Sequence, residues 1–227
     1  MSSNPRIAAE TQNNSEPRQL LSRGSSFKPA VWREQADNGA RIVKDLDDVP
    51  AWSRWLARWL MNRERRVLHK LKGVDGVPQL VDEWRDGFAM AEMPGVPLTA
   101  EAFQADARAL ADSLRQRTEA IHRCGVYHLD LKQRNNVLVC PPDQANLVDF
   151  GAALAPGKLG RALWGRLLAW VDQQAVWKYL ARHAPAELTL QEAKALRRAL
   201  RLRRLWFVSP HKDRGERAAV QSKIRNS

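Results

Sequence analysis

Apolar and polar residues alternate with a period of two in five short segments in the first half of the chain. This alternation is typical of half-buried β-strands, and we expect strands at residues 20–23, 30–35, 40–44, 77–84 and 88–93. The turn formers Asp37-Asn38-Gly39 and Arg85-Asp86-Gly87 lie between neighbouring segments, where they favour tight hairpins. The pattern therefore predicts a five-stranded antiparallel sheet.

Elsewhere apolar residues recur at steps of three and four, which predicts helices at residues 52–71, 101–123, 159–183 and 190–206. Thr189 and Glu192 have the spacing of a capping box ahead of the last helix. Two further strand-like runs, at residues 136–139 and 146–148, flank a segment rich in turn formers and should pair as a hairpin. We therefore expect an α+β fold, in which a sheet with one main helix precedes a mainly helical part.

Neither end of the chain shows the period of a strand or the period of a helix. Residues 1–19 are polar and rich in Ser and Asn, so we expect a disordered leader. Residues 209–227 are polar and charged, and we expect a tail without structure. Between these ends the pattern divides the chain into a sheet part at residues 20–95 and a helical part at residues 96–208.

Two polar motifs flank the expected hairpin: H-L-D-L-K-Q-R-N precedes its first strand, and D-F-G follows its second. Because the two strands run antiparallel, Asp130, Asn135 and Asp149 should meet at one end of the hairpin. Phosphoryl transfer needs such a set, with one carboxylate to orient the attacking hydroxyl and an amide and a second carboxylate to hold Mg²⁺ on the nucleotide phosphates. We expect Asp130 in the first role, and Asn135 and Asp149 as the metal ligands.

At this spacing the two motifs resemble the catalytic loop and the metal-binding segment of the protein-kinase superfamily. The resemblance implies a two-lobed fold, ATP and Mg²⁺ as cofactors, and a catalytic role for Lys132 in neutralising the transferring phosphate. It also implies that Lys44, at the end of a strand, contacts the α and β phosphates. Glu64 of the first helix stands where a kinase has the carboxylate that pairs with this lysine.

Other parts of the resemblance are weaker. Only Gly24 stands where a kinase has a glycine-rich loop over the phosphates. The segment M-A-E-M-P-G resembles a hinge in which the Met93 N–H and the Ala91 carbonyl bind adenine. Leu129 replaces the arginine that reads a phosphorylated activation loop, and no A-P-E sequence follows the D-F-G.

Within the superfamily, these features resemble most the bacterial lipopolysaccharide core kinases and compact RIO-like kinases. The activity implied is transfer of the ATP γ-phosphate to a sugar hydroxyl of an envelope glycolipid. A small serine/threonine protein kinase is the first alternative, because Lys132 is the residue type found in those enzymes. The second alternative is a nucleotide-binding pseudokinase that acts as a scaffold, and Mg²⁺-dependent ATP turnover separates it from the enzymes.

Lys and Arg outnumber Asp and Glu by 37 to 25, and the resulting net charge of +12 indicates an anionic partner. We expect ATP and an anionic glycolipid or membrane surface as partners, and we do not expect nucleic acid. The tryptophan-rich segment 52–63 could lie on an anionic membrane, or its apolar stripe could pack on the protein. The same choice between a membrane and a solvated face applies to a second group: Arg197, Arg198, Arg201, Arg203, Arg204, Trp206 and Phe207.

The chain has two cysteines, Cys124 and Cys140, which are too few for a disulfide scaffold and lie outside any metal-ligand spacing. The N-terminus lacks the apolar core of a signal peptide, and no apolar run approaches the length of a membrane span. We therefore expect a cytoplasmic protein that can associate peripherally with the inner face of the cytoplasmic membrane. The sequence does not indicate an oligomeric state.

Overall fold

The computed structural model describes residues 18–37, 39–140, 143–203 and 214–225. The first half of the chain forms a sheet in the order β1-β2-β3-β5-β4, and each neighbouring pair is antiparallel. The strands are β1 (Gln19–Ser22), β2 (Ala30–Ala36), β3 (Gly39–Asp45), β4 (Leu80–Trp84) and β5 (Gly87–Ala91). The α+β class and the five-stranded antiparallel sheet expected from the sequence are confirmed.

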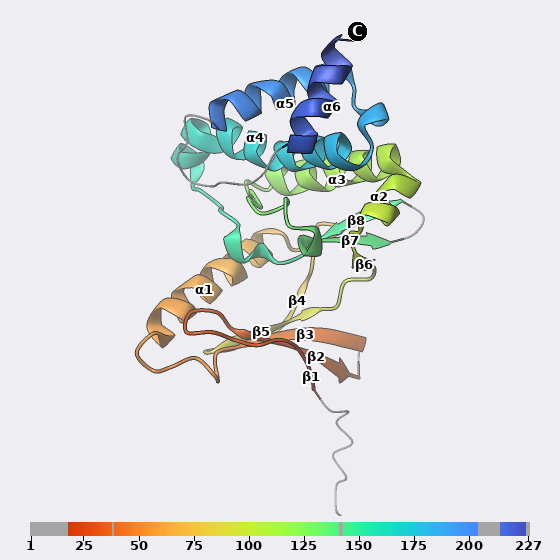
Figure 1. Ribbon diagram of the computed structural model, residues 1–227. Coiled ribbons are helices and arrows are strands. Elements are labelled where there is room, and N and C mark those ends of the chain that lie inside the picture. The colour runs from red at the N-terminus through yellow and green to blue at the C-terminus, as the bar shows by residue number, and fades with distance from the viewer. Residues whose placement is uncertain (1–17, 38, 141–142, 204–213, 226–227) are drawn as a thin grey trace, which may run out of the picture.

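Helix α1 (Arg54–Lys70) packs beside this sheet (Figure 1). Its buried residues recur at steps of three and four and form one face: Ala57, Met61, Glu64, Val67 and Leu68. The side chains of Trp52, Trp55 and Trp59 are 66%, 69% and 52% exposed. The interpretation that the tryptophan stripe packs on the protein is therefore wrong.

The rest of the chain is mainly helical. Its elements are β6 (Val96–Pro97), α2 (Ala100–Ala105), α3 (Ala107–Arg123), η1 (Arg134–Asn136), β7 (Val137–Cys140), β8 (Gln144–Leu147), η2 (Phe150–Ala152), α4 (Lys158–His183), η3 (Pro185–Glu187), α5 (Leu190–Arg203) and α6 (Arg214–Arg225). Figure 1 shows the five-stranded sheet at one end of the molecule and α3 to α6 at the other, with β6, β7 and β8 between them. The expected hairpin is confirmed as β7 and β8, and β6 adds a third strand that the sequence did not indicate.

The helix expected at residues 101–123 is divided at Asp106. This residue has φ of −148° and ψ of +67°, outside the helical region, and its side chain accepts a 3.3 Å hydrogen bond from the Ala109 N–H. Asp106 therefore ends α2 and caps α3. The capping box ahead of α5 is confirmed, because the Glu192 N–H donates to Thr189 Oγ1 at 3.2 Å and the Thr189 N–H donates to Glu192 Oε2 at 2.9 Å.

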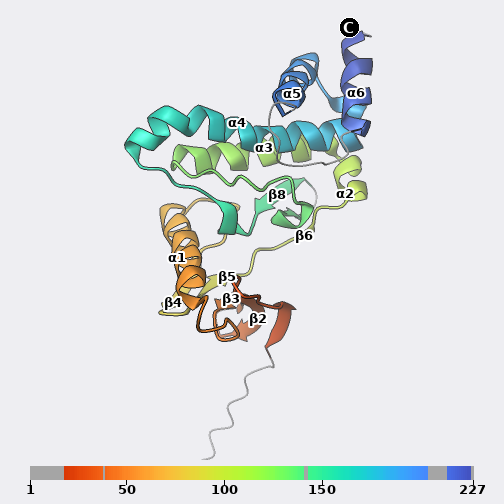
Figure 2. The ribbon, with the colours of Figure 1, turned by 60° about the vertical axis from the view of Figure 1, so that its left-hand side comes forward.

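The segment expected to be an unstructured tail instead contains α6. This helix packs against α4 and α5, and Val220 and Glu216 are buried there (Figure 2). Arg182 of α4 donates a 2.6 Å hydrogen bond to Glu216 Oε1, which compensates the buried charge. Charged residues dominate the composition of the segment, but a few apolar residues at helical spacing suffice to bury one face.

Other expectations fall partly outside the described residues. The leader expected at residues 1–19 lies there up to residue 17, whereas Gln19 already belongs to β1. The segment 204–213 and the side chains of Arg201 and Arg203 also lie outside the described residues. Arg197 and Arg198 of α5 are exposed. Cys124 and Cys140 are both free thiols.

The buried apolar residues form one cluster that runs through both parts of the molecule. It includes Met61 and Phe88 beside the sheet, and Leu114 and Leu180 among the helices. No helix within the described ranges is long and apolar enough to cross a membrane.

Candidate functional site

The ammonium group of Lys44 lies between two carboxylates. Its Nζ is 2.8 Å from Glu64 Oε1 and 3.1 Å from Asp149 Oδ1. Lys44 comes from β3 and Glu64 from the buried face of α1, whereas Asp149 follows β8 in the second half of the chain. The structure thus brings together three residues that the sequence analysis singled out.

Lys44 and Glu64 are buried, whereas the side chain of Asp149 is 59% exposed. Burial alone would lower the pKa of Lys44, but the charges of Glu64 and Asp149 outweigh it and raise that pKa above its usual value. The charge of Lys44 in turn lowers the pKa of Asp149, against the smaller opposing effect of burial. Lys44 and Asp149 are therefore held in their charged forms.

The backbone at Asp149 is left-handed, with φ of +60° and ψ of +75°. A non-glycine residue adopts this conformation rarely and mostly where the surroundings fix it. The short helix η2 begins immediately afterwards, and Arg63 of α1 donates a 2.5 Å hydrogen bond to the Gly151 carbonyl. This contact ties the segment of Asp149 to the helix that carries Glu64.

The segment of Asp130 lies beside that of Asp149. The Val148 N–H donates to the Asn136 carbonyl at 3.0 Å, and His128 Nε2 is 3.0 Å from the Val148 carbonyl. Asn136 is buried, and its Nδ2 donates to the Asp130 carbonyl at 3.0 Å and to Asp130 Oδ2 at 3.3 Å. The ends of β7 and β8 therefore bring Asp130, an asparagine amide and Asp149 to one region, as the hairpin predicted.

The asparagine at this point is Asn136, whereas the sequence analysis assigned the role to Asn135. The side chain of Asn135 is exposed, and within the described part of the chain it forms no hydrogen bond. The turn of η1, which covers residues 134–136, directs the second of the two adjacent asparagines towards Asp130. The spacing of the motif predicted Asn135, whereas the structure buries Asn136 and places its amide in contact with Asp130.

Asp172, in the middle of α4, was not identified from the sequence. Its buried carboxylate accepts hydrogen bonds from the main-chain N–H groups of His128 at 2.8 Å and Leu129 at 2.6 Å. It also lies 2.9 Å from His122 Nε2 of α3. A single acidic residue inside the apolar sequence A-W-V-D-Q-Q-A-V was the signal that could have revealed it.

Two other buried groups hold the segment around Asp130. Burial lowers the pKa of His128, so its neutral ring donates from Nε2 to the Val148 carbonyl. The His128 ring also packs against Phe150 with the ring centroids 4.8 Å apart. Tyr179 of α4 donates a 2.9 Å hydrogen bond to the Leu131 carbonyl, and burial raises the pKa of its hydroxyl. These contacts fix the main chain on both sides of Asp130.

The remaining predicted residues lie around this region. Ala91 ends β5, and Met93 follows it in the connection that leads to β6. The Asn146 amide of β8 donates a 3.0 Å hydrogen bond to the carbonyl of Pro94 and so fixes this connection. Lys132 is exposed, and Asp130 Oδ2 accepts a hydrogen bond from Gln133.

Gly24 lies in the connection between β1 and β2. The Ser25 N–H donates to the Lys28 carbonyl at 3.0 Å, so this connection folds back on itself. A Cβ atom at position 24 would lie 3.0 Å from the Lys28 carbonyl oxygen, which explains a glycine there on packing grounds. This close approach accounts for Gly24 without any contact to phosphate.

The oxygen atoms of Asp149 and Asn136 suit a hard divalent cation such as Mg²⁺. Within the described residues no group of three or more His, Cys, Asp or Glu side chains could hold a metal by itself. Mg²⁺ usually keeps several waters and binds one or two carboxylates together with substrate phosphates, so this sparse set fits a metal that arrives with a nucleotide.

A comparison of the sequence with protein-family models and with curated proteins found no match.

Proposed function

We propose that this chain is an ATP-dependent phosphotransferase with a two-lobed, protein-kinase-like fold. The observation that carries the proposal is the position of Lys44, which contacts Glu64 at 2.8 Å and Asp149 at 3.1 Å. Burying a lysine is costly unless it is paired, and this arrangement aims the lysine at an exposed carboxylate beside the Asp130 segment. Apart from nucleotide binding, we find few structural reasons for the buried position of the Lys44 ammonium group.

Each residue has a role in the proposed reaction. Lys44 would bind the α and β phosphates of ATP, and Glu64 would keep its side chain in place. Asp149 and Asn136 would hold Mg²⁺, which when bound neutralises charge on the phosphates. Asp130 would orient the acceptor hydroxyl and take its proton, and Lys132 would neutralise the transferring phosphate.

The adenine would lie against the connection after β5. The Met93 N–H and the Ala91 carbonyl are the donor and the acceptor that we assign to it. The hydrogen bond from Asn146 to the Pro94 carbonyl supports this assignment, because it links the connection to the strand that leads to Asp149.

The acceptor that we propose is a sugar hydroxyl of a bacterial envelope glycolipid. Helix α4 begins at Lys158, soon after η2 ends at Ala152, so only a short segment follows Asp149 before the next helix. A protein kinase uses a longer segment there to bind its peptide substrate, and the short connection therefore favours a non-peptide acceptor. A serine/threonine protein kinase remains the alternative that the acceptor test must exclude.

The first experiment measures Mg²⁺-dependent ATP turnover by the full chain and by the Asp149→Ala variant. We expect the variant to lose turnover, because Asp149 supplies the carboxylate that we assign to the metal. Asp82→Ala, at an exposed position of β4, is the matched control and should keep wild-type turnover. Equal turnover by wild type and a folded Asp149→Ala variant would refute the enzyme assignment, and a wild type that binds ATP without turnover would favour the pseudokinase scaffold.

The second experiment identifies the acceptor. Transfer of labelled phosphate from ATP is compared for lipopolysaccharide whose core phosphates have been removed and for casein as a general protein substrate. Labelling of the lipopolysaccharide alone is the expected result. Labelling of casein alone would instead assign the chain to the protein kinases.

A further inference from the structure

The first half of α4 exposes an apolar face. Leu159, Leu163 and Leu167 follow one another at steps of four and are 75%, 68% and 44% exposed, and Trp164 and Val171 extend the same face at 58% and 38%. Gly165 and Asp172 are buried on the opposite face of the helix. A soluble monomer rarely leaves a large contiguous apolar patch uncovered, so this face indicates a binding surface.

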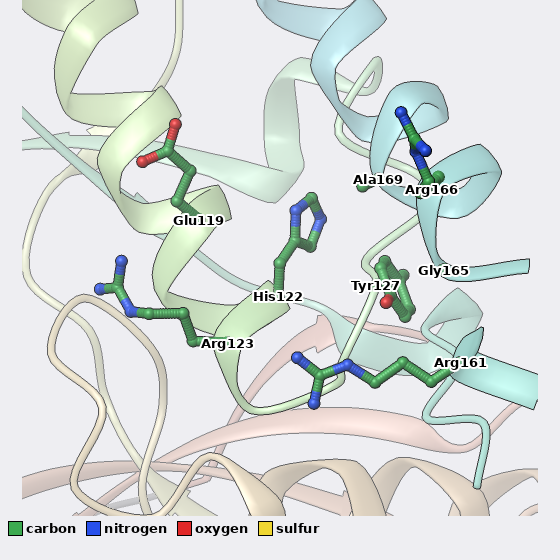
Figure 3. Close-up of a pocket in the computed structure, with 8 residues that line it drawn as sticks. All are labelled: Glu119, His122, Arg123, Tyr127, Arg161, Gly165, Arg166 and Ala169. Carbon is green, nitrogen blue, oxygen red and sulfur yellow. The ribbon is translucent and has the colours of Figure 1, made fainter. Parts of the chain in front are cut away.

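A shallow cationic pocket, open to solvent, adjoins this half of the helix. It has a volume of about 480 Å³ and lies between the end of α3 and the start of α4, with Tyr127 between the two helices (Figure 3). Arg123 comes from α3, and Arg161 and Arg166 come from α4. Within the described part of the chain none of these three guanidinium groups forms an ion pair, and Glu119 is the one acidic residue of the lining. Figure 3 shows Arg161 pointing towards the space between the helices and Arg123 and Arg166 pointing away from it, so the three guanidinium groups spread positive charge over this surface.

A second exposed apolar group belongs to α1, which lies on the same side of the molecule as the first half of α4. Three of the exposed tryptophans, Trp52, Trp55 and Trp59, belong to α1 and the residues just before it. Helix α1 and the first half of α4 both lie at the left in Figure 1 and in Figure 2, although they belong to different parts of the fold. The Arg63 guanidinium lies 5.7 Å from the centre of the Trp59 ring, so this group also combines an aromatic surface with positive charge.

The charges decide which partner fits. Residues 158–171 contain Lys158, Arg161 and Arg166 and no acidic residue, and the whole chain carries a net charge of +12. A second copy of the chain would bring like charges together at this face, which opposes self-association. An anionic bilayer offers phosphate groups to the arginines, a headgroup boundary that tryptophan favours, and an extended surface that reaches both helices at once.

We propose that the first half of α4 docks on an anionic phospholipid bilayer. Leu159, Leu163, Trp164 and Leu167 lie at the boundary between headgroups and acyl chains, and the exposed Arg161 and Arg166 meet lipid phosphates at the surface. The tryptophans of α1 contact the same surface. This inference is independent of phosphoryl transfer, because membrane binding can be measured without ATP.

The test is co-sedimentation of the full chain with vesicles at low ionic strength. Vesicles of phosphatidylcholine alone are compared with vesicles in which about a third of the lipid is phosphatidylglycerol. The first variant is Leu159→Gln/Leu163→Gln/Leu167→Gln, and the second is Arg161→Gln/Arg166→Gln. All five side chains are exposed, so the variants should fold, and circular dichroism and urea unfolding verify this.

We expect the wild type to bind the anionic vesicles and to dissociate at high salt. Each cation near such a surface contributes roughly fivefold, so Arg161→Gln/Arg166→Gln should bind about tenfold to thirtyfold more weakly. The triple leucine variant should bind at least about tenfold more weakly, because three apolar side chains no longer enter the boundary. The matched controls, Leu21→Gln/Val81→Gln/Val96→Gln and Arg85→Gln/Lys194→Gln, change exposed residues elsewhere and should bind as the wild type does.

Three results would overturn the proposal. The first is a folded wild type that ignores anionic vesicles at low salt, which would leave the face to a soluble partner. The second is undiminished binding by both α4 variants. The third is a wild-type dimer in light scattering, without lipid, that the triple leucine variant dissociates, because this would assign the face to a second copy of the chain.

Discussion

The carboxylate of Asp172 accepts a 2.6 Å hydrogen bond from the main-chain N–H of Leu129. Leu129 has φ of +65°, a left-handed conformation that costs a leucine about 1–2 kcal/mol. The hydrogen bonds to Asp172 offset this cost and hold the residue just before Asp130 in place. A buried acid on α4 thus shapes the segment that carries the proposed base.

Replacing Asp172 should destabilise the fold. Asp172→Ala leaves the N–H groups of His128 and Leu129 buried without an acceptor, which should lower the free energy of unfolding by about 3–5 kcal/mol. Urea unfolding measures the loss. Asp112→Ala is the control, because Asp112 lies on the exposed side of α3 and pairs there with Arg115, so it should change the free energy by less than about 1 kcal/mol. Similar losses for both variants would contradict the assigned role of Asp172.

The two adjacent asparagines should differ sharply in their effect on turnover. Asn136→Ala removes a buried amide that contacts Asp130, and we expect it to lower Mg²⁺-dependent ATP turnover by about 100-fold or more. Asn135→Ala changes an exposed side chain and should leave turnover within about threefold of wild type. Turnover assays at several Mg²⁺ concentrations make the comparison. A larger loss for Asn135→Ala than for Asn136→Ala would instead support Asn135 as the metal ligand, as the motif spacing predicted.

Lys44 and Glu64 should act as one unit. Lys44→Met and Glu64→Gln should each lower turnover strongly, by about 100-fold, and the double variant should be little worse than either alone. Glu83→Gln, which removes a carboxylate from a partly exposed pair with His69, should leave turnover unchanged. If the two single losses multiply in the double variant, the contact of 2.8 Å between Lys44 and Glu64 has no functional meaning.

His128 should make stability depend on pH below neutrality. Burial lowers its pKa from the ordinary value of 6.5, so the unfolded chain takes up a proton at a pH where the folded chain does not. The free energy of unfolding should therefore fall as pH falls from about 6.5 towards the folded pKa, by at most about 1.4 kcal/mol per pH unit.

Urea unfolding at about pH 5 and about pH 7.5 tests this for wild type and for His128→Gln, which cannot take up that proton. The other histidines are common to both proteins, so the difference between them isolates His128. A wild type whose stability changes with pH no more than that of His128→Gln would contradict the assignment of a neutral, buried ring.

The local pattern of the sequence was sufficient for the sheet. Alternation and turn formers predicted all five strands, and the T-x-x-E spacing predicted the contacts between Thr189 and Glu192. Periodicity also predicted the strand of Lys44 and the helix of Glu64, whereas their contact was expected from the resemblance to the protein-kinase superfamily. The strands and the helix cap are determined by residues that lie close together in the sequence, so the local pattern of apolar and polar residues was enough to predict them.

The features that the sequence did not predict correctly depend on tertiary packing. Both faces of α1 carry apolar residues, so periodicity could not decide whether Trp55 or Met61 is buried. Adjacent asparagines satisfy the same motif within one residue, and only the turn of η1 selects Asn136. The charged composition of the last segment concealed α6, whose burial requires the faces of α4 and α5.

The contact between Lys44 and Asp149 has a consequence for how the molecule can open. Lys44 and Glu64 both belong to the sheet part, so their buried charges cancel within that part. Asp149 belongs to the helical part and is exposed, so water can solvate its charge if the two parts separate. The ion pair that crosses between the parts is thus less costly to break than the buried pair of Lys44 with Glu64.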